Sequence, residues 1–327
     1  MITVKPPSPE TLANAMRTHP AIRSKLGISA ATDALGLTVK SHGRPGDDAA
    51  ILPREGGFDL LAGEGFIPRF VDQDPKFAGW CGIMVNLSDI AAMGGRAVGL
   101  VNQIWAPSSA AAEDLLRGLR DASEAYRVPL VGGHTNLSAG ELNLAVSVFG
   151  RATRVITSFD AAPGDILIAA IDHRGAYYNF DNWCAAIGVA STRLQGDLEL
   201  LPTLAEAGLV TAGKDISQSG LAGTALMLAE ASQVGLEIDL EAITPPADVP
   251  LQRWMVSFPS FGFLLCAAPD KASEVISRFE ARDIRASEIG RVTAGNSVAF
   301  LSDDQRSVFW DYAQMPYLGL GGRSPHA

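Results

Sequence analysis

The sequence has few cysteines, no long apolar run and a shortage of positive charge. Its three cysteines, Cys81, Cys184 and Cys266, lie far apart and form no C-x-x-C pair, which argues against a disulfide framework and a zinc knuckle. No stretch approaches the ~18 consecutive apolar residues of a membrane span, and residues 1–10 lack the apolar core of a signal peptide. Lys and Arg number 26 against 36 Asp and Glu, and the net charge of −10 opposes nonspecific binding to nucleic acid. We therefore predict a cytoplasmic protein with neither a membrane nor a nucleic-acid partner.

The composition is suited to two folded domains. The chain has 327 residues, of which 47% are hydrophobic, and a domain commonly holds about 100–150 residues. A Pro163-Gly164 turn followed by an apolar segment marks a break near the middle of the sequence. We predict an N-terminal helical lead-in at 1–40, a first domain at 41–155, a second domain at 156–310 and a Gly-rich, mobile tail at 311–327.

Apolar spacing predicts a mixed α+β fold. Steps of three and four residues indicate amphipathic helices, whereas short apolar runs bounded by Gly, Pro or polar residues indicate strands. Ser108 or Ser109 is placed to cap one of these helices. The predicted helices lie within 11–27 and at 75–93, 109–126, 220–234 and 271–282, and the predicted strands at 58–62, 97–105, 129–131, 142–150, 166–171, 236–240, 261–267 and 297–301.

Four short segments place a carboxylate or an imidazole beside small, flexible residues. Glycine lets backbone N–H groups approach phosphate oxygens closely, and carboxylate oxygens are the ligands that Mg²⁺ prefers. Any one such segment is most often a turn in which Asp bonds its own backbone, but the four together predict a metal–phosphate site. The segments are Gly46-Asp47-Asp48-Ala49-Ala50, Asn86-Leu87-Ser88-Asp89-Ile90-Ala91-Ala92-Met93-Gly94-Gly95, Gly132-Gly133-His134-Thr135-Asn136 and Asp215-Ile216-Ser217-Gln218-Ser219-Gly220.

These segments resemble the motifs of the aminoimidazole ribonucleotide (AIR) synthetase superfamily. That superfamily includes thiamine-monophosphate kinase, selenophosphate synthetase and a hydrogenase maturation protein, and the resemblance runs from about Gly46 to Val292. It implies an α+β, two-domain AIR synthetase-like fold, in which an N-terminal α/β domain dimerises through its strands and is followed by a C-terminal α+β domain. It also implies ATP bound with Mg²⁺ in the cleft between the domains, and chemistry on the γ-phosphate that depends on positioning and charge neutralisation.

The resemblance also assigns roles to single residues. Glu64 stands where relatives carry an Asp before a glycine, and it reaches one methylene further. Either Asp47 or Asp48 matches the first metal-binding Asp, because neighbouring side chains in an extended segment point to opposite sides. The implied metal ligands are Asp47, Asp48, Glu64, Asp89 and Asp215; the implied nucleotide contacts are Gly46, Asn86, Gly132, Gly133, His134, Thr135 and Lys214; and Asp89, His134 and Asp215 are the implied catalytic residues.

The variant residues of these motifs point to no single branch of the superfamily. His134 follows the form seen in selenophosphate synthetase, whereas thiamine-monophosphate kinase has Asp there. The sequence has no Cys before Cys81, although selenophosphate synthetase uses a reactive Cys or selenocysteine near its N-terminus. We therefore predict an ATP- and Mg²⁺-dependent homodimeric enzyme that phosphorylates, or activates by phosphorylation, an unidentified small-molecule acceptor.

Two other functions fit the sequence, and His134 and the segment from His173 to Tyr178 each have a second, structural interpretation. The alternative functions are that of a thiamine-monophosphate kinase and that of a noncatalytic subunit that binds nucleotide. His134 is alternatively a neutral imidazole hydrogen-bonded in a turn. The segment from His173 to Tyr178 follows a predicted strand, where it either contacts the second substrate or forms a solvated loop.

Overall fold

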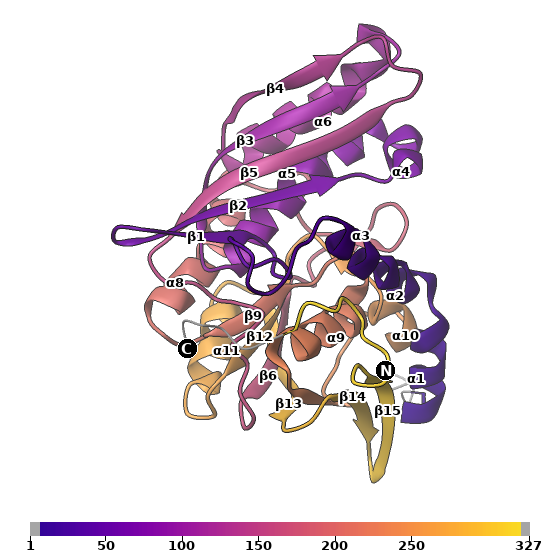
Figure 1. Cartoon of the computed structure of the whole chain (residues 1–327), viewed down its shortest axis with the longest axis vertical. Helices are drawn as coiled ribbons and strands as arrows, with labels where there is room; N and C mark the ends of the chain where they lie inside the picture. Colours follow the sequence, from indigo (N-terminus) through magenta and orange to yellow (C-terminus); the bar gives the residue numbers. More distant parts are fainter. Residues whose placement is uncertain (1–6, 322–327) are drawn as a thin grey trace. The chain divides into compact units, whose positions relative to one another are not determined.

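The computed structural model describes residues 7–321, which form two compact units. The N-terminal unit consists of Asp48–Val155 and Gly188–Glu206. The C-terminal unit consists of the described residues up to Asp47, together with Ile156–Ile187 and the described residues from Ala207 onward. Each unit contains its own sheet (Figure 1). In the described part of the chain, no helix has both the length and the hydrophobicity that a membrane span requires.

A five-stranded sheet organises the N-terminal unit. Its strand order is β1-β2-β5-β3-β4, and only β3 and β4 run parallel. Alternate residues of β5, from Leu144 to Ala152, are buried, and helix α5 packs against this side of the sheet (Figure 1). The elements are β1 (Ala50–Arg54), β2 (Gly57–Gly65), α4 (Pro68–Gln73), α5 (Pro75–Ala92), β3 (Arg96–Trp105), α6 (Ser109–Tyr126), β4 (Leu130–Asn136), β5 (Asn143–Ala152), α7 (Ser191–Leu198) and α8 (Leu200–Glu206).

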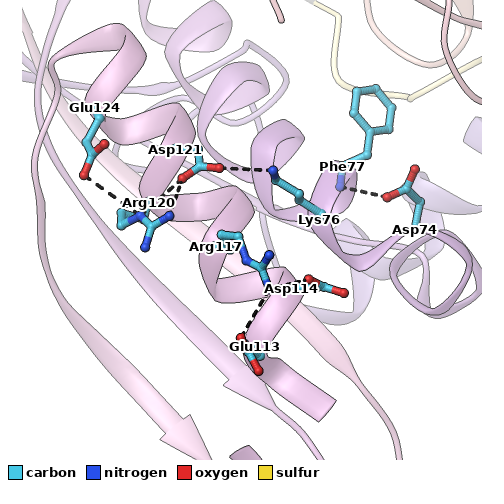
Figure 2. A network of polar contacts seen from close by, with 9 residues as sticks. All are labelled: Asp74, Lys76, Phe77, Glu113, Asp114, Arg117, Arg120, Asp121 and Glu124. Carbon is cyan, nitrogen blue, oxygen red and sulfur yellow. Dashed lines mark hydrogen bonds and ion pairs between the residues drawn. The ribbon is translucent and has the colours of Figure 1, made fainter. Parts of the chain in front are cut away.

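Helices α5 and α6 approach each other closely because glycines line their contact. A Cβ added at Gly79 would lie 2.2 Å from the carbonyl oxygen of Leu115, so a larger residue there would force the helices apart. At the start of α5, the Asp74 side chain accepts a hydrogen bond from the Phe77 N–H at 3.0 Å (Figure 2). Lys76 pairs with Asp121 of α6 at 3.3 Å (Figure 2). Helix α5 is buried on nearly all sides, whereas its sequence spacing predicts one buried face.

A seven-stranded sheet organises the C-terminal unit. Its order is β15-β14-β10-β13-β6-β12-β9, and the inner strands β6 and β12 are buried along their whole length. Helix α9 is also buried throughout, because it is apolar on all sides and packs against this sheet. The elements are β6 (Ile166–Ile171), β9 (Ala212–Asp215), α9 (Gly220–Ser232), β10 (Gly235–Asp239), α10 (Leu251–Trp254), β12 (Gly262–Ala267), α11 (Ala272–Glu280), β13 (Arg285–Thr293), β14 (Ser297–Ser302) and β15 (Gln305–Asp311), with a small sheet of β7 (Ala176–Tyr177), β8 (Asn182–Cys184) and β11 (Phe258–Pro259).

The N-terminal lead-in packs against the last strands of the C-terminal unit. Its helices are α1 (Pro9–Thr18), α2 (Pro20–Arg23) and α3 (Ile28–Ala34), with the 3₁₀ turn η1 (Ser24–Gly27) between the last two. Proline has no N–H and fixes its φ angle, so Pro20 separates α1 from α2. Arg17 of α1 donates from Nε to the carbonyl oxygen of Phe309 at 2.9 Å, while Leu12 and Met16 are fully buried.

The segment after β15 is ordered by one buried carboxylate. Glu230 of α9 accepts hydrogen bonds from the N–H groups of Tyr317 at 2.7 Å, Leu318 at 2.6 Å and Gly319 at 3.2 Å. The Tyr317 hydroxyl donates to the carbonyl oxygen of Ile22 at 2.8 Å. Hydrogen bonds and burial thus join the predicted mobile tail to the C-terminal unit as far as residue 321, and the rest of 311–327 lies outside the described residues.

Candidate functional site

Two carboxylates come together in the N-terminal unit. Asp48 lies two residues before the start of β1, and Asp89 lies in the last turn of α5, where it is 7% exposed. A carboxylate oxygen of Asp48 lies within 4.8 Å of one of Asp89. Negative charges at this spacing repel each other unless a cation or a proton offsets them, and hard oxygen ligands suit Mg²⁺. The pair therefore fits a divalent cation.

Asn86 provides a second sign that a ligand belongs here. It lies one turn before Asp89 on α5 and is fully buried. Its Nδ2 donates to the carbonyl oxygen of Gly82 at 2.8 Å, whereas its Oδ1 accepts no hydrogen bond from any described residue. A buried acceptor without a donor costs about 1–3 kcal/mol, so such atoms commonly face a bound water or ion. A hydrated Mg²⁺ would supply the missing donor through its water.

The structure separates the two neighbouring aspartates. Asp47 belongs to the C-terminal unit, where its carboxylate accepts hydrogen bonds from the N–H of Ser158 at 3.0 Å and from the Ser158 hydroxyl at 2.5 Å. Gly46 has φ +112°, which a side chain would strain, and a Cβ there would lie 3.0 Å from Cβ of Leu320. Asp47 is thus occupied by Ser158, whereas Asp48 lies close to Asp89.

The glycine pair and His134 lie within strand β4. The sequence predicts that this strand stops before Gly132, but it continues to Asn136 and pairs in parallel with β3. A Cβ at Gly133 would lie 2.3 Å from the carbonyl oxygen of Asn102, so close strand pairing accounts for this glycine. Residues 132–135 are all exposed, and His134 belongs to no metal-binding cluster of the described residues.

Glu64 and Lys214 are placed less favourably than their sequence positions suggest. Glu64 is exposed near the end of β2 opposite Val146, and no metal-binding cluster among the described residues includes it. Lys214 and Asp215 end strand β9 of the C-terminal unit, and both are 5% exposed. Because successive side chains on a strand point to opposite faces, these two do not project from the same face of β9.

Sequence reasoning missed a basic residue beside the first motif. The Arg44 guanidinium lies 3.6 Å from the centre of the Phe159 ring. Burial lowers the pKa of Arg44, and the negative charges of Asp160 and Asp47 act in the opposite direction. The sequence indicates a role for Arg44 only through its position two residues before Gly46. Its neighbours Phe159 and Asp160 lie more than 100 residues away in the sequence, so their proximity could not be predicted.

Comparisons with known proteins match both halves of the chain. Residues 46–152 match the N-terminal domain of AIR synthase related proteins, and residues 189–302 match their C-terminal domain. An uncharacterized Synechocystis protein is 43% identical over 86% of this chain and 88% of its own length. The thiamine-monophosphate kinase of Synechococcus elongatus is 30% identical over 80% of this chain and 88% of its own length. A solved structure described as AaThiL complexed with AMPPCP and TMP, 20% identical, matches with a TM-score of 0.65 over 86% of this chain and 94% of that chain, which shows a common fold.

Proposed function

Because the chain belongs to the AIR synthase related family, we propose that it is an enzyme that uses ATP and Mg²⁺ to phosphorylate a small molecule or to activate it by phosphorylation. The observation that carries this proposal is the Asp48–Asp89 pair beside the unsatisfied Oδ1 of Asn86. The similarity to a thiamine-monophosphate kinase, and to a solved structure that contains the ATP analogue AMPPCP, supports it.

The proposed metal ligands are Asp48, Asp89 and Asp215, with Asp47 and Glu64 as further candidates from the motifs. Bound Mg²⁺ would neutralise charge on the ATP phosphates. Asn86 would orient a metal-bound water through its Oδ1. Further nucleotide contacts are proposed for Gly46, Gly132, Gly133, His134, Thr135 and Lys214.

The proposed metal ligands and nucleotide contacts position the substrates and stabilise the charge on the phosphates; none of these residues is proposed as a nucleophile. An acceptor oxygen forms a bond to the γ-phosphorus while the bond to the β–γ bridging oxygen breaks, and the electron pair of that bond leaves with ADP. His134, Asp89 and Asp215 are the proposed catalytic residues because they stand in the sequence motifs that resemble those of the family. The exposure of His134 leaves its imidazole accessible to a phosphate.

Calorimetric titration with a nonhydrolysable ATP analogue tests the proposal. We expect the wild type to bind the analogue only with Mg²⁺, and Asp89→Asn to lose that binding while keeping its circular dichroism spectrum. Asp114→Asn is the matched control, because Asp114 is an exposed residue of α6 that pairs with Arg117. Absence of binding to folded wild type, or full Mg²⁺-dependent binding by Asp89→Asn, would contradict the proposed site.

Thiamine-monophosphate kinase is the second candidate, favoured by the relative that is 30% identical. Formation of thiamine diphosphate from ATP and thiamine monophosphate would establish it directly. A protein that binds the ATP analogue but turns over no acceptor in a broad panel would instead support a noncatalytic, nucleotide-binding subunit.

We also propose a homodimer that forms through the five-stranded sheet. Leu61 of β2, Trp105 of β3 and Val131 of β4 are exposed, and Val131 is 68% exposed. Leu61 and Trp105 alternate with buried neighbours, so they project from the sheet face opposite α5. Apolar side chains gathered on a sheet face mark an interaction surface. Sedimentation should give a dimer for the wild type and a monomer for Val131→Arg; a monomeric wild type would refute the dimer.

A further inference from the structure

The five-stranded sheet carries His134 on its outer face, which is the face opposite α5. His134 pairs with Gln103 of β3, and Gln103 pairs with Ala145 of β5. The two neighbours of Ala145 along β5, Leu144 and Val146, are buried on the side where α5 packs. Paired residues project from the same face of a sheet and successive residues from opposite faces, so His134 projects away from α5. Figure 1 shows these strands in front of α5 and α6.

The outer face has no charged residue in the rows around His134. A row here is the set of paired residues that crosses the sheet from β2 to β4. Although 19% of the whole chain is charged, these four rows contain no Asp, Glu, Lys or Arg, and His134 is their one ionisable side chain. The rows are Leu61, Phe149 and Gly99; Gly63, Ser147, Val101 and Gly132; Gly65, Ala145, Gln103 and His134; and Asn143, Trp105 and Asn136.

Charged side chains begin beyond these rows. Arg151 of β5 pairs with Asp59 of β2 at 3.3 Å, and Asp59 also pairs with Arg54 of β1 at 3.3 Å. Arg151 comes six residues after Ala145 on β5, which places it about 20 Å from the row of His134. Glu141, in the connection from β4 to β5, is exposed. The four rows themselves therefore offer no negative charge to offset a protonated His134.

Large apolar side chains lie exposed on the same face. Leu61 is 49% exposed and Trp105 37%, while Val131, which lies beside Gly99, is 68% exposed. Exposed apolar side chains gathered in this way mark an interaction surface. Two copies of one chain meet in a symmetric dimer through the same surface, so a charged surface would face charge of its own sign, whereas an uncharged surface would not. The lack of charge thus favours a second copy of this chain as the occupant.

We propose that a second copy covers the outer face, that His134 lies in this contact as a neutral imidazole, and that protonation of His134 dissociates the dimer. This inference rests on the proposed homodimer and makes its formation depend on one side chain. It also assigns His134 to the subunit contact instead of to a phosphate.

The direction of the pH dependence follows from the cost of burying charge. A charged imidazole buried among uncharged groups loses its hydration without gaining an opposite charge, whereas a neutral imidazole can hydrogen-bond to amides such as those of Gln103 and Asn136. Histidine ordinarily changes its charge between pH 5 and 8. The monomer would take up protons that the dimer excludes, so dimerisation should weaken as the pH falls.

Sedimentation velocity at pH 8 and at pH 5.5 tests the inference on the full chain. Each dimer contains two copies of His134, and each should weaken dimerisation about tenfold at the lower pH, so the Kd of the wild-type dimer should rise about 100-fold. His134→Gln, which stays neutral, should dimerise with equal affinity at both pH values. His134→Arg, which is always charged, should be monomeric at both. His42→Gln should keep the wild-type pH dependence, because His42 is an exposed histidine of the C-terminal unit.

Circular dichroism at both pH values checks that loss of the dimer is not unfolding. Equal affinity of the wild type at both pH values overturns the inference and leaves the homodimer standing. A pH dependence that persists in His134→Gln, or a stable dimer of His134→Arg at pH 8, does the same. A folded wild type that is monomeric at pH 8 overturns both the inference and the homodimer.

Titration of the same samples with the ATP analogue and Mg²⁺ separates the inference from the proposed enzymatic function. If the wild type does not bind the analogue but its dimer dissociates at pH 5.5 through His134, the ATP site fails and the inference stands. Loss of analogue binding in His134→Gln, together with dimerisation like that of the wild type at both pH values, overturns the inference in favour of a phosphate contact.

Discussion

Replacement of Glu230 by Gln should destabilise the C-terminal unit through the segment that follows β15. The carboxylate is 4% exposed and accepts three backbone hydrogen bonds, from Tyr317, Leu318 and Gly319. A carboxamide keeps one acceptor oxygen and turns an NH₂ donor toward at least one N–H group. The segment would then lose a charged hydrogen bond and retain weaker ones.

The magnitude follows from the number and type of these bonds. A hydrogen bond to a charged group contributes about 1.5–3 kcal/mol, and a neutral one about 1 kcal/mol. One lost bond and two weakened ones give a loss of about 3 kcal/mol in the free energy of unfolding. For a unit of this size that corresponds to a decrease of roughly 6–12 °C in Tm.

Differential scanning calorimetry of wild type and Glu230→Gln measures the change. Glu237→Gln is the control, because Glu237 pairs with Arg306 at 2.8 Å, its side chain is 34% exposed, and a partly exposed pair contributes about 1 kcal/mol or less. If Glu230→Gln melts within about 2 °C of the wild type, which corresponds to less than 1 kcal/mol, the carboxylate does not order this segment.

Three further outcomes are expected. Gly133→Ala should lower stability by about 1–3 kcal/mol because its Cβ would lie 2.3 Å from a carbonyl oxygen, whereas Gly140→Ala, with open space around it, should not; equal thermal midpoints would contradict this. As the pH falls from 6.5 to 4, the free energy of unfolding of the wild type should decrease more than that of His173→Gln. His173 takes up a proton at its ordinary pKa in the unfolded chain, but only near pH 4 in the folded chain, where burial lowers its pKa. Urea midpoints that change in parallel for the two proteins would refute the buried neutral imidazole. Asp48→Asn should abolish Mg²⁺-dependent binding of the ATP analogue, whereas Asp47→Asn should lower Tm and retain binding. Loss of binding in Asp47→Asn but not in Asp48→Asn would mean that Asp47 is the metal ligand.

The elements predicted best from the sequence are those with strong local signals. Helix α6 begins and ends where the sequence predicts, because its apolar spacing is regular and Ser108 accepts from the Ala111 N–H at 3.2 Å. Strand β13 was not predicted, since it is polar and its register shifts between Glu288 and Gly290. Strand β15 was missed as well, because this edge strand begins with the polar residues Gln305-Arg306-Ser307 and has only a short apolar part.

The candidate site was predictable in its residue types but not in its arrangement. The motifs placed Asp89 and Asn86 on one helix, and the structure puts the Asp89 carboxylate close to that of Asp48. Sequence could not distinguish Asp48 from Asp47, because the distinguishing partner, Ser158, is 111 residues away from Asp47. The contacts of the tail could not be predicted for the same reason, since glycine content is a local signal and Glu230 is a distant partner.

The pairing of α1 with β15 has a consequence for synthesis on the ribosome. Arg17 contacts the backbone of Phe309, 292 residues later in the chain. Strands β1 to β5 of the N-terminal unit leave the ribosome as one continuous segment, so that sheet can form while translation continues. Helix α1, with its apolar residues Leu12 and Met16, must instead wait for nearly the whole chain to be translated before its partner strand exists. Chaperone binding to the nascent chain should therefore concentrate on the earliest segment rather than on the N-terminal sheet.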